Sequence, residues 1–188
     1  MKRLFLLSLV LSLVVFGPGI PSYPGDLQMA QADTTTILVL DVAFDGATFA
    51  VNQVAPGAPA LARGDTFVLN GKVFPGETIP AGNDFNPNSP GSIGNFICRG
   101  TLLFSGAEIA AGAAPFVATT QTFVLDGGSA LLTEGLEAGV SPITRSVTGG
   151  WGQYSGAGGE VTLNLIGFNI TGFENYRFTF TLKKQAPK

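Results

Sequence analysis

The side chains that could take part in chemistry are few in this sequence, and their types restrict the possible reactions. There is no histidine, so the commonest general base and the commonest metal ligand are absent. A histidine-dependent triad or zinc site is therefore excluded, and we expect neither a metal nor a cofactor. The weak catalytic candidates that remain are Asn52, Asn70, Cys98 and Glu108.

Each of these candidates has a functional and a structural interpretation. Asn52 and Asn70 could orient a ligand in an apolar cavity, or could bond local backbone at strand ends and bulges. Cys98 could touch a ligand, or could be a small apolar core residue, as buried free cysteines usually are. Glu108 and Glu134 could be acids of raised pKa at an apolar rim, or ordinary surface carboxylates.

Four further residues have two interpretations each. Asp41 lies in an apolar stretch and would be costly if it pointed inward unpaired, so we place it on an outer face. Trp151 and Tyr154 are either structural corner residues or a lid over a ligand. Asn169 begins an Asn-Ile-Thr pattern that is a glycosylation acceptor in a eukaryotic secretory path.

The elements that must position these residues are short apolar or alternating runs separated by Gly, Pro, Asn and Asp, which indicates an all-β fold. A loop is expected over 75–91, a turn-rich stretch over 145–159, and at most one helical turn over 108–114. The predicted strands are 36–44, 48–54, 66–74, 95–105, 116–125, 129–136, 160–170 and 176–184.

The last predicted strand alternates with a period of two. Tyr176, Phe178, Phe180 and Leu182 share one face, so we expect Phe178 and Phe180 to point inward and contribute to ligand binding. Eight or nine strands fit a sandwich or a barrel, and an eight-stranded barrel is just wide enough to hold one small ligand.

The composition limits the class of partner. Charged residues make up 12% of the chain, about half the usual share, and there are 15 phenylalanines. Residues 33–188 carry eight basic and twelve acidic side chains, without a basic stripe. Nucleic acid and anionic membrane surfaces are therefore unfavourable partners, whereas a small lipophilic molecule suits the composition. A single cysteine excludes an internal disulfide.

The N-terminus predicts export. Lys2 and Arg3 precede thirteen apolar or small residues, Leu4 to Phe16, which is short for a bilayer span and typical of a secretory signal. Ala30-Gln31-Ala32 is a small-x-small cleavage pattern. We expect a signal peptide over 1–32, a single β domain over 33–188 without a stable membrane span, and a secreted, periplasmic or extracellular location; an uncleaved anchor is the alternative.

One glycine-rich stretch resembles a known family. The stretch looks like the C-terminal part of the allene oxide cyclase barrel and, more loosely, of plant dirigent proteins. Shorter similarities at Gly64-Asp65, Gly91–Phe104 and Phe123–Gly128 extend the resemblance over most of residues 50–184. It implies an eight-stranded antiparallel β-barrel with an apolar cavity, and related barrels commonly form homo-oligomers. The matching residues are Val147, Thr148, Gly149, Gly150, Gly152, Tyr154, Gly156, Gly159, Glu160 and Val161.

The cyclase site transfers only in part. Asn52 matches the family's asparagine, but Ala50 stands where its glutamate would be. A later asparagine aligns with Asn70 or Gly71, and the family's cysteine falls nearest Gly100, two residues after Cys98. The resemblance thus implies the framework rather than the allene oxide reaction.

Three functions remain open. The first is a cofactor-free cyclase or isomerase, or a dirigent-like guide of cyclisation, acting on a lipophilic ligand by orientation and exclusion of water. The second is a carrier of a lipophilic molecule, and the third is a structural or surface-interaction barrel. An open cavity with one or two convergent polar groups favours the first, a wholly apolar cavity the second, and a filled interior the third.

Overall fold

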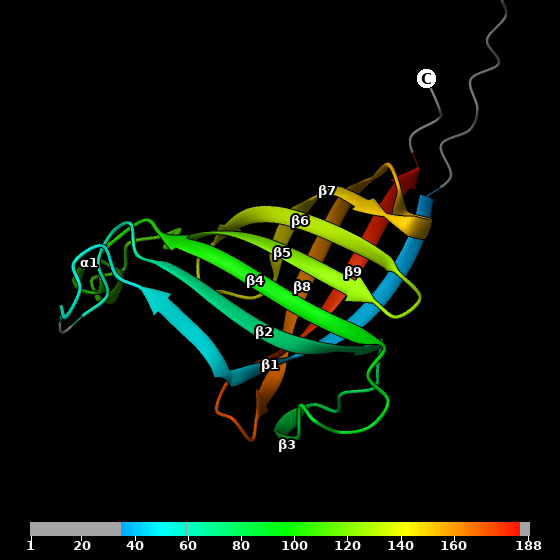
Figure 1. Cartoon of the computed structure of the whole chain (residues 1–188), viewed down its shortest axis with the longest axis horizontal. Coiled ribbons are helices and arrows are strands. Elements are labelled where there is room, and N and C mark those ends of the chain that lie inside the picture. The colour runs from blue at the N-terminus through cyan, green and yellow to red at the C-terminus, as the bar shows by residue number, and fades with distance from the viewer. Residues whose placement is uncertain (1–34, 59, 185–188) are drawn as a thin grey trace, which may run out of the picture. The chain divides into compact units, whose positions relative to one another are not determined.

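The computed structural model describes residues 35–58 and 60–184, which form a β-barrel (Figure 1). The predicted signal peptide and its cleavage site lie outside these residues. Within the described part, no helix is long and apolar enough to cross a membrane. The elements are β1 (Thr35–Asn52), β2 (Thr66–Pro75), β3 (Gly82–Phe85), β4 (Gly94–Leu102), α1 (Gly106–Ala110), β5 (Val117–Leu125), β6 (Ser129–Glu137), β7 (Ile143–Trp151), η1 (Gly152–Tyr154), β8 (Ala157–Asn169) and β9 (Glu174–Lys184).

The barrel is closed by eight antiparallel strands. The strand order is β3-β8-β7-β6-β5-β4-β2-β1-β9, and β9 also pairs with β8, which joins the two ends of the sheet. Closure leaves none of these eight strands as an unpaired edge, which is the usual solution for an all-β chain of this size. The predicted eight-stranded antiparallel barrel is therefore confirmed.

Two parts of the strand prediction were wrong. The runs 36–44 and 48–54 were expected to be two strands, but residues 35–52 form one strand, β1, whose pairing with β2 shifts register between Asp45 and Ala50. The stretch 145–159 was expected to be turn-rich, yet its first half is β7. Neighbours on both sides, β6 and β8, pair with β7 and hold it extended despite its glycines.

The loop expected at 75–91 contains β3 and covers part of the outer surface. β3 pairs in parallel with the end of β8, and Ile79 packs on Ala43 and Phe74. Asp41 is fully buried beneath this cover, on the outer face as predicted. Its carboxylate accepts hydrogen bonds from Arg177 at 2.8 Å and from the backbone N–H of Ile79 at 2.9 Å, so the buried charge is paired.

One half of the barrel interior is packed solid. Phe96, Phe123, Phe178 and Phe180 are fully buried, with ring centroids 4.9–5.8 Å apart across β4, β5 and β9. Phe178 and Phe180 thus point inward as predicted, but they lie in this packed half. The opposite half, where the strands meet the connections 53–65, 103–116, 138–142 and 170–173, is open and holds the cavity.

Candidate functional site

A cavity of about 400 Å³ opens at the end of the barrel opposite the phenylalanine cluster. Its wall is largely apolar and aromatic, with a few polar groups. Pockets of about 300–1,000 Å³ with this kind of lining are typical of small-molecule sites. The lining side chains that carry the later argument are Cys98, Gln121, Glu137 and Tyr176 on the inner wall, and Asp65 and Glu174 nearer the mouth.

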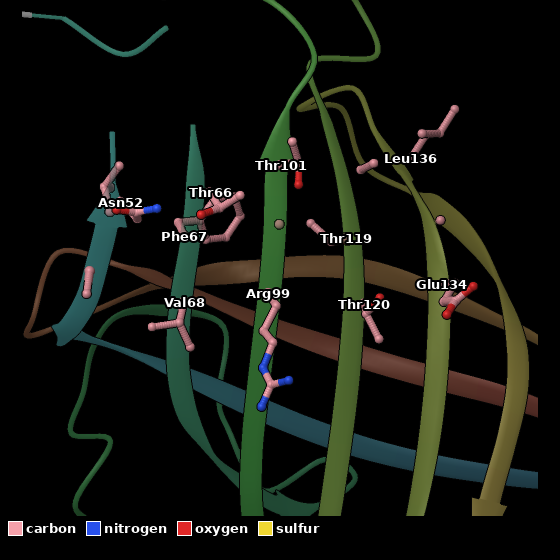
Figure 2. A pocket seen from close by; sticks show the side chains of 15 residues that line it. Asn52, Thr66, Phe67, Val68, Arg99, Thr101, Thr119, Thr120, Glu134 and Leu136 are labelled. Atoms are coloured by element: carbon pink, nitrogen blue, oxygen red, sulfur yellow. The ribbon is translucent and has the colours of Figure 1, made fainter. Parts of the chain in front are cut away.

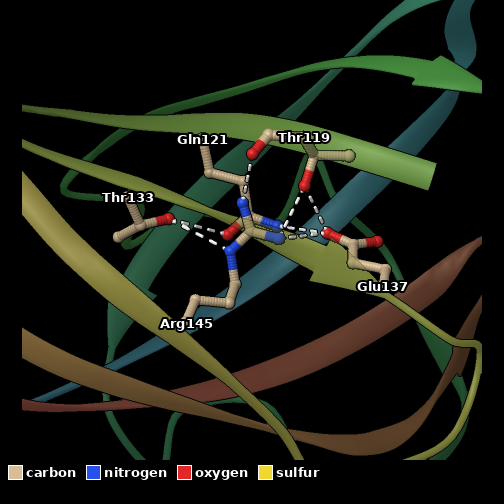
Figure 3. A network of polar contacts seen from close by, with 5 residues as sticks. All are labelled: Thr119, Gln121, Thr133, Glu137 and Arg145. Carbon is tan, nitrogen blue, oxygen red and sulfur yellow. Dashed lines mark hydrogen bonds and ion pairs between the residues drawn. The ribbon is translucent and has the colours of Figure 1, made fainter. Parts of the chain in front are cut away.

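A buried polar cluster joins the inner wall of this cavity (Figure 3). Its centre is Glu137, whose Oε1 accepts hydrogen bonds from Thr119 at 2.7 Å, Gln121 at 3.1 Å and Arg145 at 2.7 Å. The Arg145 side chain is wholly buried, whereas 21% of the Glu137 side chain is exposed. Of the two charged members of the cluster, Glu137 is therefore the one that a ligand can reach.

The guanidinium of Arg145 is held from three sides. Nε donates to the Thr133 hydroxyl at 3.3 Å, Nη1 to the Thr119 hydroxyl at 2.6 Å, and Nη2 to the Thr119 carbonyl at 2.7 Å. Burial lowers the pKa of Arg145 below its ordinary value, and the charge of Glu137 opposes this effect. These contacts fix the Glu137 carboxylate, as a site for oriented binding requires.

The second oxygen of Glu137, Oε2, takes no part in the cluster. Among the described residues it has no hydrogen-bond partner, and Figure 3 shows it pointing away from the other four side chains. No buried side-chain polar atom of the described residues lacks a partner, so Oε2 is not sealed inside the protein. It is an acceptor available to whatever fills the cavity.

Two more polar groups in the cavity wall are kept neutral. Burial, followed by the charge of Glu137, raises the pKa of the Cys98 thiol to about 12. Burial, followed by the charges of Glu174 and Glu137, raises the pKa of the Tyr176 hydroxyl to about 12. Both groups are protonated near neutral pH, so they can donate hydrogen bonds but are poor nucleophiles.

Of the predicted site residues, the structure brings Cys98 alone to this cavity. Asn52, at the exposed end of β1, lines a separate groove on the outer face of β1, β2, β4, β5 and β6 (Figure 2). Asn70 is half-buried on the outer face of β2, because its neighbour Leu69 points inward. Phe178 and Phe180 pack behind the cavity.

Glu108 has a structural role at the surface. It occupies the third position of α1 in a capping box, where its carboxylate accepts from the N–H and hydroxyl of Ser105. These bonds lower the pKa of Glu108, which is the opposite of the raised pKa expected at an apolar rim. Its other oxygen pairs with exposed Arg63 at 2.8 Å.

The other residues with two interpretations are also placed. Glu134 lies on the outer face, in the groove shown in Figure 2, which Arg99 also lines. Tyr154 packs against the core as a corner residue, whereas Trp151 is 46% exposed. Asn169 is buried, and its Nδ2, the atom that a glycan would occupy, donates to the Phe44 carbonyl and to Asn175.

Sequence reasoning missed Glu137, Arg145 and their partners. Glu137 lies one residue beyond the predicted strand 129–136, and Arg145 fell in the stretch expected to be turns. A period-two signal was present, since Thr119 and Gln121 alternate in phase with inward-pointing Phe123, and Thr133 with Leu131. Polar residues in the inward phase of neighbouring strands indicate a buried polar cluster.

Among the described residues, no group of three or more Cys, Asp or Glu side chains is arranged to hold a metal ion. No family model and no curated protein matches the sequence. Solved structures match at low identity. The pterocarpan synthase dirigent protein PsPTS1 superposes with a TM-score of 0.58 at 13% identity, over 82% of this chain and 97% of that chain.

A second pterocarpan synthase dirigent protein, GePTS1, gives a TM-score of 0.57 at 14% identity, over 82% of this chain and 92% of that one. A pyocyanin demethylase gives 0.51 at 20% identity, over 78% of this chain and 100% of that one. These likenesses confirm a dirigent-like barrel as the fold. The narrower resemblance to allene oxide cyclase stays a prediction from the sequence.

Proposed function

We propose that this dirigent-like barrel binds a small lipophilic molecule in its open half and promotes a cofactor-free cyclisation or isomerisation of it. The observation that carries the proposal is the free Oε2 of Glu137, held by the buried cluster at the wall of an apolar cavity. An open cavity with a convergent polar group distinguishes a catalytic barrel from a filled structural one and from an apolar carrier.

The chemistry that these residues can perform is limited and specific. Glu137 Oε2 can accept a hydrogen bond or a proton from the ligand, while Tyr176 and Cys98, kept neutral by burial, can donate. The aromatic wall holds the ligand in one shape and excludes water, so that a reactive molecule closes in one way. The dirigent likeness supports a guiding role of this kind, in which the protein orients an intrinsically reactive molecule.

We propose that the protein meets its substrate outside the cytoplasm, because its N-terminal residues predict a signal peptide. This part of the proposal rests on residues 1–32 alone. We expect peptide mapping of the protein recovered from its native host to find the N-terminus at Asp33.

The test begins with binding. We expect the neutral dye Nile red to bind and fluoresce in the cavity, and Val51→Trp, which adds bulk to the cavity wall, to weaken binding. Val68→Trp is the matched control, because Val51 borders both the cavity and the outer groove, whereas Val68 lines the outer groove alone. Equal loss in both variants would contradict the cavity as the site.

The test then addresses catalysis. Solvent extraction and mass spectrometry of the purified protein identify a bound lipophilic molecule, which is returned to fresh protein. We expect its conversion to an isomer of the same mass, slowed in Glu137→Gln. Binding without conversion would establish a carrier in place of an enzyme.

A further inference from the structure

The charges around the cavity are unbalanced in one direction. Three of its lining residues, Asp65, Glu137 and Glu174, carry carboxylates, and none of its described lining residues carries a basic group. Arg145 is the nearest buried cation, but its nitrogens are engaged behind Glu137, away from the cavity (Figure 3). One guanidinium therefore opposes three carboxylates.

The connections at the mouth do not correct this imbalance. Arg63 is the single base among the described residues of 53–65 and 103–116, and it is paired with Glu108. The Asp65 carboxylate is fixed by the backbone N–H groups of Val54 and Ala62, both at 2.8 Å, and it forms no ion pair with any described residue. A cleft lined by charge of one sign, with low-dielectric walls, concentrates ligands of the opposite sign.

The raised pKa values of two groups in the cavity wall are consistent with a negative potential inside the cavity. After burial, the carboxylates of Glu137 and Glu174 are what raise the pKa of Tyr176, and Glu137 also raises that of Cys98. The same carboxylates that make ionisation of Cys98 and Tyr176 unfavourable would therefore attract a positively charged ligand.

The apolar part of the wall also suits a cation. Six aromatic residues contribute to it, including Phe44 against Tyr176 at 5.5 Å and Phe49 against Phe67 at 5.7 Å between ring centroids. Aromatic faces attract cations whose charge is spread over an apolar body, more so where water is excluded. Such a cation fits both the rings and the free oxygen of Glu137.

We propose that the cavity selects lipophilic cations, with a quaternary or delocalised nitrogen charge on an apolar body, over neutral and anionic molecules of the same shape. This inference rests on the proposed function, because it specifies the ligand of the same site. Glu137 Oε2 is the main determinant of the preference.

The experiment compares three flat probes of nearly equal size, the cation N-methylquinolinium, neutral 1-methylnaphthalene and anionic 1-naphthoate, by calorimetry or dye displacement. We expect the cation to bind about tenfold or more tightly than the neutral probe, and the anion least tightly. In Glu137→Gln the preference should largely disappear. Glu134→Gln is the control, since Glu134 lies on the same strand but on the outer face, and it should keep the preference.

Wild-type protein provides a second measurement that needs no variant. Added salt should weaken binding of the cation and leave that of the neutral probe unchanged. Equal or tighter binding of the neutral probe, or equal loss of preference in both variants, would overturn the cation inference while leaving the proposed function standing. Failure of all three probes and of Nile red to bind would overturn the proposed function itself, and the inference with it.

Discussion

Single residues decide where the candidate site lies, and the Glu137–Arg145 pair is the clearest case. A charge inside a barrel is costly unless it is paired and its hydrogen bonds are complete. Here Arg145 meets that condition through Thr119, Thr133 and Glu137, and the cost of burying it is offset by contacts that also orient the carboxylate. The buried side of the pair is therefore structural, and its open side is the part to which we assign a role in ligand binding.

Removal of Arg145 should destabilise the fold. In Arg145→Met the Glu137 carboxylate and the Thr119 carbonyl lose their cationic partner, and breaking a buried ion pair in this way typically costs about 3–5 kcal/mol. Urea denaturation followed by tryptophan fluorescence measures the change. Arg63→Met is the control, because the exposed Arg63–Glu108 pair is screened by water and its loss should have little effect. Similar losses in both variants would contradict the importance of burial.

Cys98 gives a prediction for alkaline pH. Its pKa is raised to about 12 in the folded protein, so its thiol ionises more readily after unfolding. The resulting stabilisation is complete below the ordinary thiol pKa and is lost as the pH rises toward the folded value. Between about pH 8 and pH 11, wild type should lose more free energy of unfolding than Cys98→Ala. Parallel pH profiles of the two proteins would argue against a buried, neutral thiol.

At the scale of elements, neighbouring strands override local sequence. The stretch with Gly149 and Gly150 was expected to be turns, yet pairing with β6 keeps this end of β7 extended, while β8 pairs with the first half of the strand. β1 was expected as two strands, because the Asp45-Gly46 pair resembles a turn. The strand instead continues through this pair, because β2 pairs with β1 on both sides of the register shift, and β9 pairs with its first half.

The two adjacent glycines of β7 should respond differently to alanine. A Cβ on Gly150 would lie 2.5 Å from the Ala130 carbonyl oxygen and 2.7 Å from that of Tyr154, whereas a Cβ on Gly149 meets open space. Because backbone atoms cannot move aside easily, Gly150→Ala should cost about 1–3 kcal/mol of stability. Gly149→Ala, measured by the same thermal denaturation, should change little. The reverse order would show that this corner is packed differently.

For the whole molecule, the barrel is divided between stability and function. The half around Phe96, Phe123, Phe178 and Phe180 is filled by packed side chains, and the half around Glu137 holds the cavity in which we propose that the ligand binds. An asymmetric interior of this kind allows a small domain to keep a dense core and still carry a cavity.

This division predicts a separation of effects. Phe180→Ala should cost about 3–5 kcal/mol in stability, because it leaves a void in the packed half. Its affinity for Nile red, measured on the folded protein, should be unchanged. If so large a truncation prevents folding, Phe180→Leu is the milder test. A loss of dye affinity as large as that in Val51→Trp would mean that the two halves are coupled.

Homo-oligomerisation also belongs to this scale and stays a prediction. The outer groove of about 860 Å³ borders the cavity at Val51, Thr66 and Phe67, and the proposed function does not use it. Light scattering of the purified protein measures the oligomeric state directly.

The sequence by itself determined the fold class, because period-two alternation and turn residues depend only on local chemistry. It also excluded histidine chemistry and an internal disulfide, because a chain without histidine and with one cysteine can form neither in any fold.

Only the tertiary structure decided which polar residues meet. Glu137 and Arg145 lie on neighbouring strands, and Thr119 on a third, so their convergence depends on register and closure, which no local pattern contains. Asn52 and Asn70 were chosen because they align with asparagines of the allene oxide cyclase family, yet the register of their strands places both side chains on the outer surface. A one-residue shift reverses the face of every side chain in a strand, and register is set by the whole barrel.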